Sequence, residues 1–172
     1  MRRLDVGCGK QKEKNFTHYL DKFKYGFNKV FDLESGKKLP YKTNFFDFIN
    51  CRNTLEHLNN VEFVMREIHR ILKVGGKVKI TVPYYRHPNA VQPLHKRYFS
   101  WQSMNYWTNI GEEMCLEGNP RFKLISKEWI WEDPKLEKIL GWFAKKNPLK
   151  YERFVAVFFP ARRIEMVFEK VL

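Results

Sequence analysis

Two glycines near the start of the chain are the first residues whose type and spacing suggest a ligand site. The run Leu4-Asp5-Val6-Gly7-Cys8-Gly9 is a short apolar strand that leads into a turn with two glycines. Because glycine lacks a Cβ atom, the backbone can bend sharply there and approach a ligand closely. A strand that ends in this way is typical of sites that hold a nucleotide-like molecule at the edge of a sheet. A tight turn without a ligand has the same pattern, so the rest of the chain must decide.

His95 and Arg97 are further residues whose types could do chemistry. An unperturbed imidazole titrates near physiological pH, which makes His95 the best candidate for a general base. Arg97 could hold an anionic acceptor through a bidentate contact. Tyr84, Tyr85 and Tyr98 are expected to line the pocket beside them. The alternative is that His95 and Arg97 only tie a surface segment to the sheet.

The length of 172 residues predicts one domain with a single core. A hydrophobic fraction of 44% excludes a disordered chain, and the longest apolar run, residues 154–161, is too short to cross a membrane. A strand directly after Met-Arg-Arg leaves no signal peptide, so we expect a cytoplasmic protein. The three cysteines form no CxxC pair and predict neither a zinc site nor a disulfide framework; they are Cys8, Cys51 and Cys115.

The charge of the chain is strongly unbalanced, with 32 Lys and Arg against 19 Asp and Glu and a net charge of +13. Such a field favours anionic partners, including nucleic acid, phosphorylated metabolites or an anionic membrane surface. A lysine-rich surface of the kind found in heat-adapted proteins would give the same balance. The basic residues lie in small clusters and form no long basic tail.

Strand and helix patterns alternate through the first half of the chain, which predicts βα units and a parallel sheet. The stretch from Gly9 to Asn15 is too short and too charged for a full crossover helix. Asn59 or Asn60 is expected to cap a helix that continues to Leu72, with Lys73 in its last turn and Gly75-Gly76 as its stop. The expected strands of this half are residues 3–6, 16–21, 29–33, 45–51 and 78–82.

The second half of the chain is less regular. The region from residue 84 to about 121 is rich in aromatic residues and Asn, and we expect it to cover a pocket. Residues 122–131 predict a strand and residues 134–146 an amphipathic helix. Residues 151–159 fit a helix or a strand, and we favour a helix. Residues 163–171 predict a final antiparallel strand at or near the edge of the sheet.

The ordered series of motifs over residues 3–83 resembles the class I S-adenosylmethionine-dependent methyltransferases, as a small member of the type 11 kind. Residues 44–49, NFFDFI, are similar to the "dNsFDxI" entry to the fourth strand of that family, and residues 66–76 closely resemble its "EixRvLKpGG" stretch. The resemblance implies an α/β, Rossmann-like, doubly wound and mostly parallel sheet with an antiparallel C-terminal strand. Gln11 replaces a family glycine, so the first helix is expected to be abbreviated, and Val74 replaces a family proline.

The resemblance implies S-adenosylmethionine as the cofactor, with S-adenosylhomocysteine as the product. The glycines would pack against the methionine tail, Asp5 would orient the turn, and the backbone at Arg52-Asn53 would face the sulfonium. Leu55 would pack near the adenine or the ribose. The full set of expected cofactor-binding residues is Asp5, Gly7, Cys8, Gly9, Asp21, Asp32, Leu33, Arg52, Asn53 and Leu55.

Two aspartates compete for the ribose diol, which a carboxylate binds with two hydrogen bonds. A spacing of about 20 residues from the glycines favours Asp32. The family order favours Asp21, with Asp32 and Leu33 lining the adenine. We favour Asp21, because a shortened first connection explains its early position.

Three functions remain open at this level. The first is a methyltransferase for a small or medium-sized acceptor that is anionic or carries a hydroxyl group, and the second is a methyltransferase for nucleic acid (RNA). The third is a binding module for S-adenosylmethionine or nucleic acid without catalysis.

Methyl transfer is an in-line displacement on an activated carbon, so no metal is expected. Glu56 and His57 are expected either to cap a helix or to contact the ligand, and a homodimer would help to close the open site.

Overall fold

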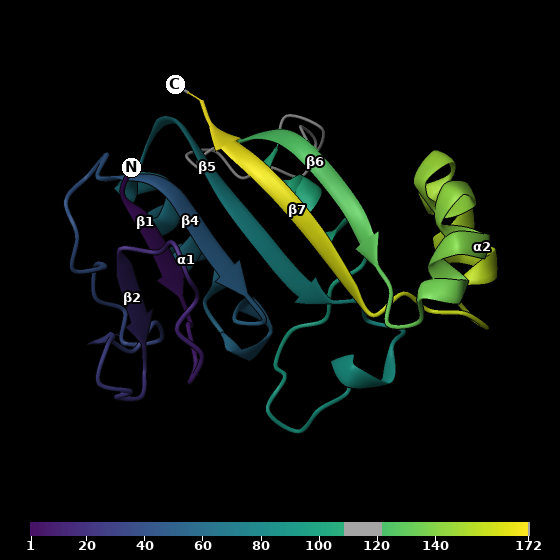
Figure 1. The fold of residues 1–172 in the computed structure, drawn as a ribbon, viewed down its shortest axis with the longest axis horizontal. Helices are drawn as coiled ribbons and strands as arrows, with labels where there is room; N and C mark the ends of the chain where they lie inside the picture. The colour runs from purple at the N-terminus through teal and green to yellow at the C-terminus, as the bar shows by residue number, and fades with distance from the viewer. Residues whose placement is uncertain (109–121, 172) are drawn as a thin grey trace.

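The computed structural model describes residues 1–108 and 122–171, and its centre is one seven-stranded sheet (Figure 1). The strand order is β3-β2-β1-β4-β5-β7-β6. Strands β1 to β5 pair in parallel, whereas β7 runs antiparallel to both β5 and β6. The strands are β1 (Arg3–Val6), β2 (His18–Asp21), β3 (Lys29–Val30), β4 (Phe46–Arg52), β5 (Leu72–Pro83), β6 (Phe122–Ile130) and β7 (Arg163–Lys170). The predicted Rossmann-like sheet with an antiparallel C-terminal strand is confirmed.

The order of the strands creates a crevice beside β1. The chain proceeds outward from β1 to β2 and β3, and then returns to place β4 on the other side of β1. At such a switch point the connections leave the sheet in opposite directions, and ligands bind beyond the carboxyl ends of the strands. The Gly7–Gly9 turn follows β1 at this position.

The helix α1 (Val61–Ile71) connects β4 to β5 and covers one face of the sheet (Figure 1). Its cap is Asn60, whose side chain accepts a hydrogen bond from the Phe63 amide. Arg66 and Glu62, one helical turn apart, form an ion pair of 2.6 Å. The apolar stripe that faces the sheet contains Val64, Met65, Ile68 and Ile71.

The end of this helix differs from the expectation. The helix stops at Ile71, and β5 begins at once with Leu72, which pairs with Phe46. Lys73 therefore lies in a strand, where it forms an ion pair of 2.6 Å with Asp47. The Gly75-Gly76 pair is a bend within β5, at a place where the register between β4 and β5 shifts. The glycines were misread as a helix stop because both a helix end and a strand bulge require such backbone freedom.

The opposite face of the sheet is polar. Along β5, Val78 and Ile80 are fully buried, whereas the alternate residues Lys77 and Lys79 are not. Lys79 reaches across to Glu165 of β7 at 2.7 Å. In the described residues no helix interrupts the first connection, from β1 to β2, as the missing family glycine predicted. The strand order is thus that of a doubly wound fold, while the face opposite α1 carries charges that water can solvate.

The C-terminal part adds α2 (Pro134–Lys146), a three-residue helix α3 (Pro148–Lys150) and a π-helical turn η5 (Tyr151–Val155) between β6 and β7. Figure 1 places α2 at the opposite end of the molecule from β2. The buried Tyr151 hydroxyl donates to the Phe159 carbonyl and accepts from the Ala161 amide, which anchors the chain before β7. The helix predicted over residues 134–146 is confirmed, whereas the helix favoured for residues 151–159 ends at Val155.

The segment after β5 forms the predicted irregular cover, as far as the structure describes it. It contains the short 3-10 helices η2 (Pro88–Ala90) and η3 (Ser103–Trp107). Tyr84 forms an isolated bridge with Phe99, which returns the segment to the sheet edge. Residues 109–121, including Cys115, lie outside the described part. No helix in the described residues is long and apolar enough to cross a membrane.

His69 of α1 provides a test of this packing. Burial, with a smaller contribution from the charge of Lys170, lowers the pKa of His69 to about 4, and its ring packs edge-on against Phe122. The neutral form is favoured in the folded state, so this contribution to stability is complete above pH 6.5 and is lost as the pH falls towards 4. We expect the melting temperature of His69→Gln to fall less steeply across that range than that of the wild type. Equal slopes in a thermal melt series would contradict this.

Candidate cofactor and acceptor site

The glycine turn after β1 is held between two neighbouring strands. Gly7 and Gly9 both have positive φ, +67° and +61°. The amides of Gly7 and Cys8 donate to the Leu20 carbonyl of β2, at 2.8 and 3.3 Å. On the other side, a Cβ atom added to Gly7 would lie 2.1 Å from the Thr54 hydroxyl. Gly7 therefore permits a contact with the segment after β4 that no other residue type would allow.

A cavity of about 480 Å³ lies over this turn, within the range of pockets that bind small molecules. Its lining includes six of the ten expected cofactor-binding residues: Gly7, Gly9, Asp21, Asp32, Leu33 and Asn53. The further lining residues, which the sequence analysis did not assign to the cofactor, are Lys22, Phe23, Tyr25, Phe31, Glu34, Thr54, His57, Leu58, Leu94 and Lys96. We call this space the cofactor cavity.

The two competing aspartates both line the cofactor cavity but have different partners. Asp21, at the end of β2, accepts hydrogen bonds from the amides of Gly9 and Phe23, at 2.9 and 3.0 Å. Asp32 accepts from the Glu34 amide and lies 3.2 Å from the Lys22 ammonium. The backbone hydrogen bond and then Lys22 lower the pKa of Asp32. Asp21 is thus joined to the glycine turn, whereas Asp32 is already paired with a cation.

Four expected cofactor residues lie outside the lining of the cavity. Asp5 is buried beneath the turn, where Asn50 donates to it at 2.7 Å and burial raises its pKa. Burial also raises the pKa of Cys8 to about 11, which keeps it a thiol. Leu55 is fully buried in the core. Arg52 extends to the polar face of the sheet and forms an ion pair of 3.0 Å with Glu13.

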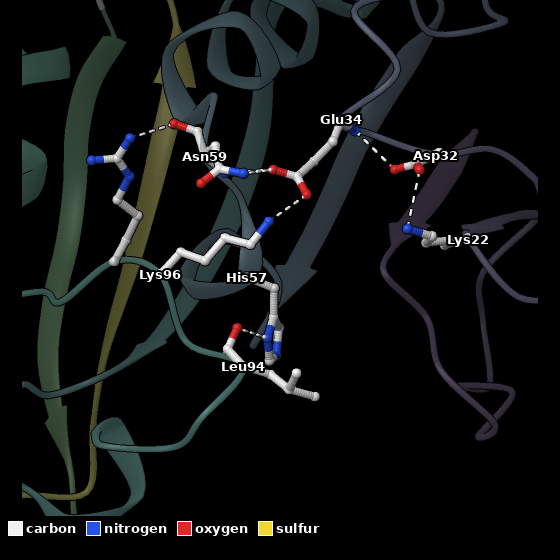
Figure 2. Close-up of polar contacts among 8 residues, drawn as sticks. Lys22, Asp32, Glu34, His57, Asn59, Leu94 and Lys96 are labelled. Atoms are coloured by element: carbon white, nitrogen blue, oxygen red, sulfur yellow. Dashed lines mark hydrogen bonds and ion pairs between the residues drawn. The ribbon is translucent and has the colours of Figure 1, made fainter.

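The rim of the cavity is closed by contacts between distant segments (Figure 2). Glu34 accepts from the amide and the side chain of Asn59, both at 2.7 Å, and forms an ion pair of 2.6 Å with Lys96. These contacts, Lys96 first, lower the pKa of Glu34. His57 donates to the Leu94 carbonyl at 3.2 Å. The segment around residues 94–96 is therefore fastened to the cavity, although 62 residues separate Lys96 from Glu34.

A second hollow of about 280 Å³ adjoins the cofactor cavity. Its lining comprises Asn53, Glu56, His57, Pro83, Asn89, Gln92, His95, Arg162 and Arg163. Asn53 and His57 line both spaces, so the two meet at these residues. We call this space the acceptor hollow.

The acceptor hollow contains His95 but not Arg97. His95 donates from Nδ1 to the Ala90 carbonyl at 2.9 Å, and its ring centroid lies 4.8 Å from that of His57. The Arg97 guanidinium donates to the Asn59 carbonyl and lines a different hollow, together with Tyr98. Of the two expected catalytic groups, only His95 is thus placed beside the cofactor cavity.

Glu56, in the 3-10 helix η1 (Leu55–His57), has an unusual environment for a carboxylate. The residue is 1% exposed, and its Oε2 atom has no hydrogen-bond partner within the described structure. Burial raises the pKa of Glu56 to about 7, although Arg163 lowers it in part. Its backbone carbonyl accepts the amides of Lys96 and Arg97, which fixes the following segment over it. None of the three tyrosines expected beside His95 lines this hollow: Tyr98 lines the same hollow as Arg97, Tyr84 is buried against Trp129, and Tyr85 packs on Tyr84.

Comparison with known proteins agrees with this geometry. Residues 19–80 match a family described as "Methyltransferase domain". An uncharacterized protein of Methanocaldococcus jannaschii is 39% identical over 90 residues, which cover 46% of this chain and 39% of that protein. The chain therefore spans well under half the length of this curated relative.

Solved structures share the fold over almost the whole chain. A SAM-dependent methyltransferase of Archaeoglobus fulgidus has a TM-score of 0.65 at 16% identity, covering 98% of this chain and 86% of its own. One from Mesorhizobium loti has a TM-score of 0.63 at 13% identity, with coverages of 98% and 90%. The Haloferax volcanii complex between the Trm112 methyltransferase activator and a methyltransferase contains a chain with a TM-score of 0.64 at 14% identity, with coverages of 99% and 82%.

The fold is that of the solved S-adenosylmethionine-dependent methyltransferases. The match of residues 19–80 to the "Methyltransferase domain" family makes this part of the chain similar to such enzymes in sequence as well as in fold.

Gly7 and Gly9 provide a matched pair of variants. We expect Gly7→Ala to weaken the binding of S-adenosylhomocysteine and to lower the melting temperature, because the new methyl group collides with Thr54. Gly9→Ala carries the same strain of positive φ, about 1 kcal/mol, but meets no atom within 4 Å. Calorimetry measures the binding of S-adenosylhomocysteine by the two variants, and thermal melts measure their stability. Adding Thr54→Ala should recover part of the loss in Gly7→Ala; equal effects of the two alanines would contradict the steric account.

Proposed function

We propose that the chain binds S-adenosylmethionine in the cofactor cavity and transfers its methyl group to an acceptor in the acceptor hollow. The observation that carries this proposal is the contact of the two spaces at Asn53 and His57. In-line transfer needs the acceptor atom, the methyl carbon and the sulfur on one line, with cofactor and acceptor entering from opposite sides. Two hollows that share a common wall satisfy this requirement.

The cofactor is expected to lie along the ends of the first three strands. The methionine tail would pack over Gly7 and Gly9, where no side chain intervenes. Asp21 would hold the ribose diol, because its carboxylate lines the cavity and is oriented by the Gly9 amide. Asp32 and Leu33 would lie at the adenine.

The acceptor is proposed to be a hydroxyl-bearing or anionic molecule. His95 has Nδ1 bound to a carbonyl, so its neutral form presents the Nε2 lone pair as a proton acceptor. Arg163 lines the same hollow and has no ion-pair partner in the described residues, so it is available for an anionic group. This assigns to Arg163 the anion-binding role that the sequence suggested for Arg97.

The ribose assignment can be tested with two cofactor analogues. Loss of a hydrogen-bonded carboxylate costs about 1.5–3 kcal/mol, or roughly 10- to 150-fold in affinity. We expect Asp21→Ala to weaken the binding of S-adenosylhomocysteine by this factor. The variant should bind the 2′-deoxy analogue no more weakly than it binds the parent compound. Wild type and Asp32→Ala should still prefer the parent compound. Calorimetry that shows loss of this preference in Asp32→Ala, and not in Asp21→Ala, would reverse the assignment.

A nucleic-acid acceptor is the second candidate, and one feature favours it. Arg163 lines both the acceptor hollow and a neighbouring hollow on the polar sheet face, whose other basic residues are Arg3, Arg52 and Lys79. Arg52 and Lys79 are paired with acidic residues, but Arg3 and Arg163 have no ion-pair partner in the described part of the chain. With a net charge of +13, this path could hold a phosphate backbone that leads to the site.

Salt dependence distinguishes the two acceptors. If a single-stranded RNA follows this path, the logarithm of its affinity should fall linearly with the logarithm of the salt concentration, by about 0.7 per phosphate contact. Arg163→Ala should then reduce the slope by about 0.7, the value of one phosphate contact. Lys150→Ala, which removes an exposed lysine far from this path, should leave the slope unchanged. Fluorescence anisotropy measures both. No binding by the wild type, or equal slopes for all three proteins, would exclude the nucleic-acid path.

A partner chain also remains a prediction. Seven exposed large apolar side chains of the described residues lie on α2 and in the segment before β7: Ile139, Trp142, Leu149, Phe154, Val157, Phe158 and Phe159. A second copy of the chain would cover them in a homodimer. The Haloferax volcanii methyltransferase that shares this fold is in a complex with an activator protein, so a different protein is the other possible occupant.

A further inference from the structure

We propose that Glu56, His57 and His95 bind a divalent first-row transition-metal ion in the acceptor hollow, and that this ion holds the acceptor oxygen. The second half of this proposal rests on the proposed function, whereas the ion site itself stands on the three side chains. This site departs from the expectation of no metal, which followed from the in-line chemistry of methyl transfer. His95 lies 38 residues beyond His57, and no spacing pattern in the sequence joins them.

The three side chains converge on one point. One possible ligand atom from each of them lies within 4.8 Å of the other two. Ligands that bind one ion at about 2.1 Å lie up to about 4.2 Å apart. Three ligands around a tetrahedral ion lie about 3.4 Å apart, so the side chains would have to move together by up to about 1 Å to close around it.

Both histidines are held in the tautomer that a metal requires. A carbonyl oxygen only accepts hydrogen bonds, so Nδ1 of His57, bound to Leu94, must carry a proton, as must Nδ1 of His95, bound to Ala90. In the neutral rings the lone pair is then on Nε2. Metal-binding histidines almost always donate their other nitrogen to a carbonyl or a carboxylate in this way.

Two buried oxygens without hydrogen-bond partners in the described residues favour a cation at this place. Glu56 is almost fully buried, and its Oε2 atom accepts no hydrogen bond from the described residues. The Asn53 Oδ1 atom, also buried and without a partner there, lines the same hollow. Leaving a buried oxygen unsatisfied costs about 1–3 kcal/mol, and more when it is charged. An ion in the hollow would give the Glu56 carboxylate a partner, and the Asn53 Oδ1 atom could serve as a further oxygen ligand.

The donor set selects the class of ion. Two imidazole nitrogens and one carboxylate suit Mn²⁺, Fe²⁺, Co²⁺ or Zn²⁺, and the same set leaves open positions in known iron sites. Mg²⁺ and Ca²⁺ prefer oxygen ligands throughout. An open position in the acceptor hollow, beside the shared wall with the cofactor cavity, is where an acceptor oxygen would bind.

The ion would change the way the acceptor loses its proton. A hydroxyl group bound to a divalent cation has a lowered pKa, so its proton leaves to water and the oxygen stays on the metal. The oxygen then attacks the methyl carbon, the carbon–sulfur bond breaks, and its electron pair remains on sulfur. The products are the methyl ether, S-adenosylhomocysteine and one proton. His95 would act as a ligand in this step and not as the base.

Metal binding can be measured without any acceptor. We expect the full chain, freed of metal with a chelator, to bind one Co²⁺ per chain, with the visible absorption of a nitrogen- and oxygen-ligated ion. His57→Ala, His95→Ala and Glu56→Gln should each weaken Co²⁺ binding more than tenfold. His69→Gln, a histidine on α1 that faces Phe122, is the matched control and should bind as the wild type does.

Each outcome separates the metal site from the proposed function. A melting temperature within a few degrees of the wild type shows that each variant is folded, and the wild type is titrated separately with S-adenosylhomocysteine, which would occupy the cofactor cavity. If Co²⁺ does not bind at one per chain, or if the three variants bind it as the control does, the metal site is refuted. If Co²⁺ binds as expected but S-adenosylhomocysteine does not bind to the wild type, the metal site stands and the proposed function fails.

Discussion

The contact between Gly7 and Thr54 is the constraint on which the site depends. Thr54 donates to the Val6 carbonyl, and the turn amides bind Leu20, so this contact joins the ends of β1, β2 and β4 at one place. Any side chain at position 7 would separate the strand ends. The absence of a Cβ atom thus sets the shape of the cofactor cavity, and Asn53, one residue before Thr54, becomes the wall shared with the acceptor hollow.

The two spaces differ in the charges that surround them. The acids of the cofactor cavity mostly have cationic or amide partners. Lysine side chains therefore balance the charges of Asp32 and Glu34 before a ligand binds. In the acceptor hollow, by contrast, Glu56 has an oxygen without a hydrogen-bond partner in the described structure, and Arg163 faces the same space. Buried polar groups are normally satisfied, and exceptions occur where function needs them. These unsatisfied groups are the reason for proposing that the chemistry takes place in the acceptor hollow.

The sequence predicted those features that depend on local patterns. The strand before Gly7, a helix cap at Asn59 or Asn60 and the limits of α2 follow from turn, cap and periodicity rules; the structure confirms them, with Asn60 as the cap. Contacts between distant residues escaped prediction, because no spacing rule joins Glu34 to Lys96 or His57 to His95. The helix stop at Gly75-Gly76 was wrong for a related reason: pairing of Leu72 with Phe46 ends the helix earlier, and only the sheet reveals that pairing.

The central claim is that cofactor and acceptor meet at the wall formed by Asn53 and His57. A crystal structure of the chain with S-adenosylhomocysteine tests it most directly. The account predicts that the ribose hydroxyls bind Asp21, that the methionine tail crosses Gly7 and Gly9, and that the sulfur faces the acceptor hollow beside Asn53. A ligand bound elsewhere, or a sulfur turned away from the acceptor hollow, would contradict the account.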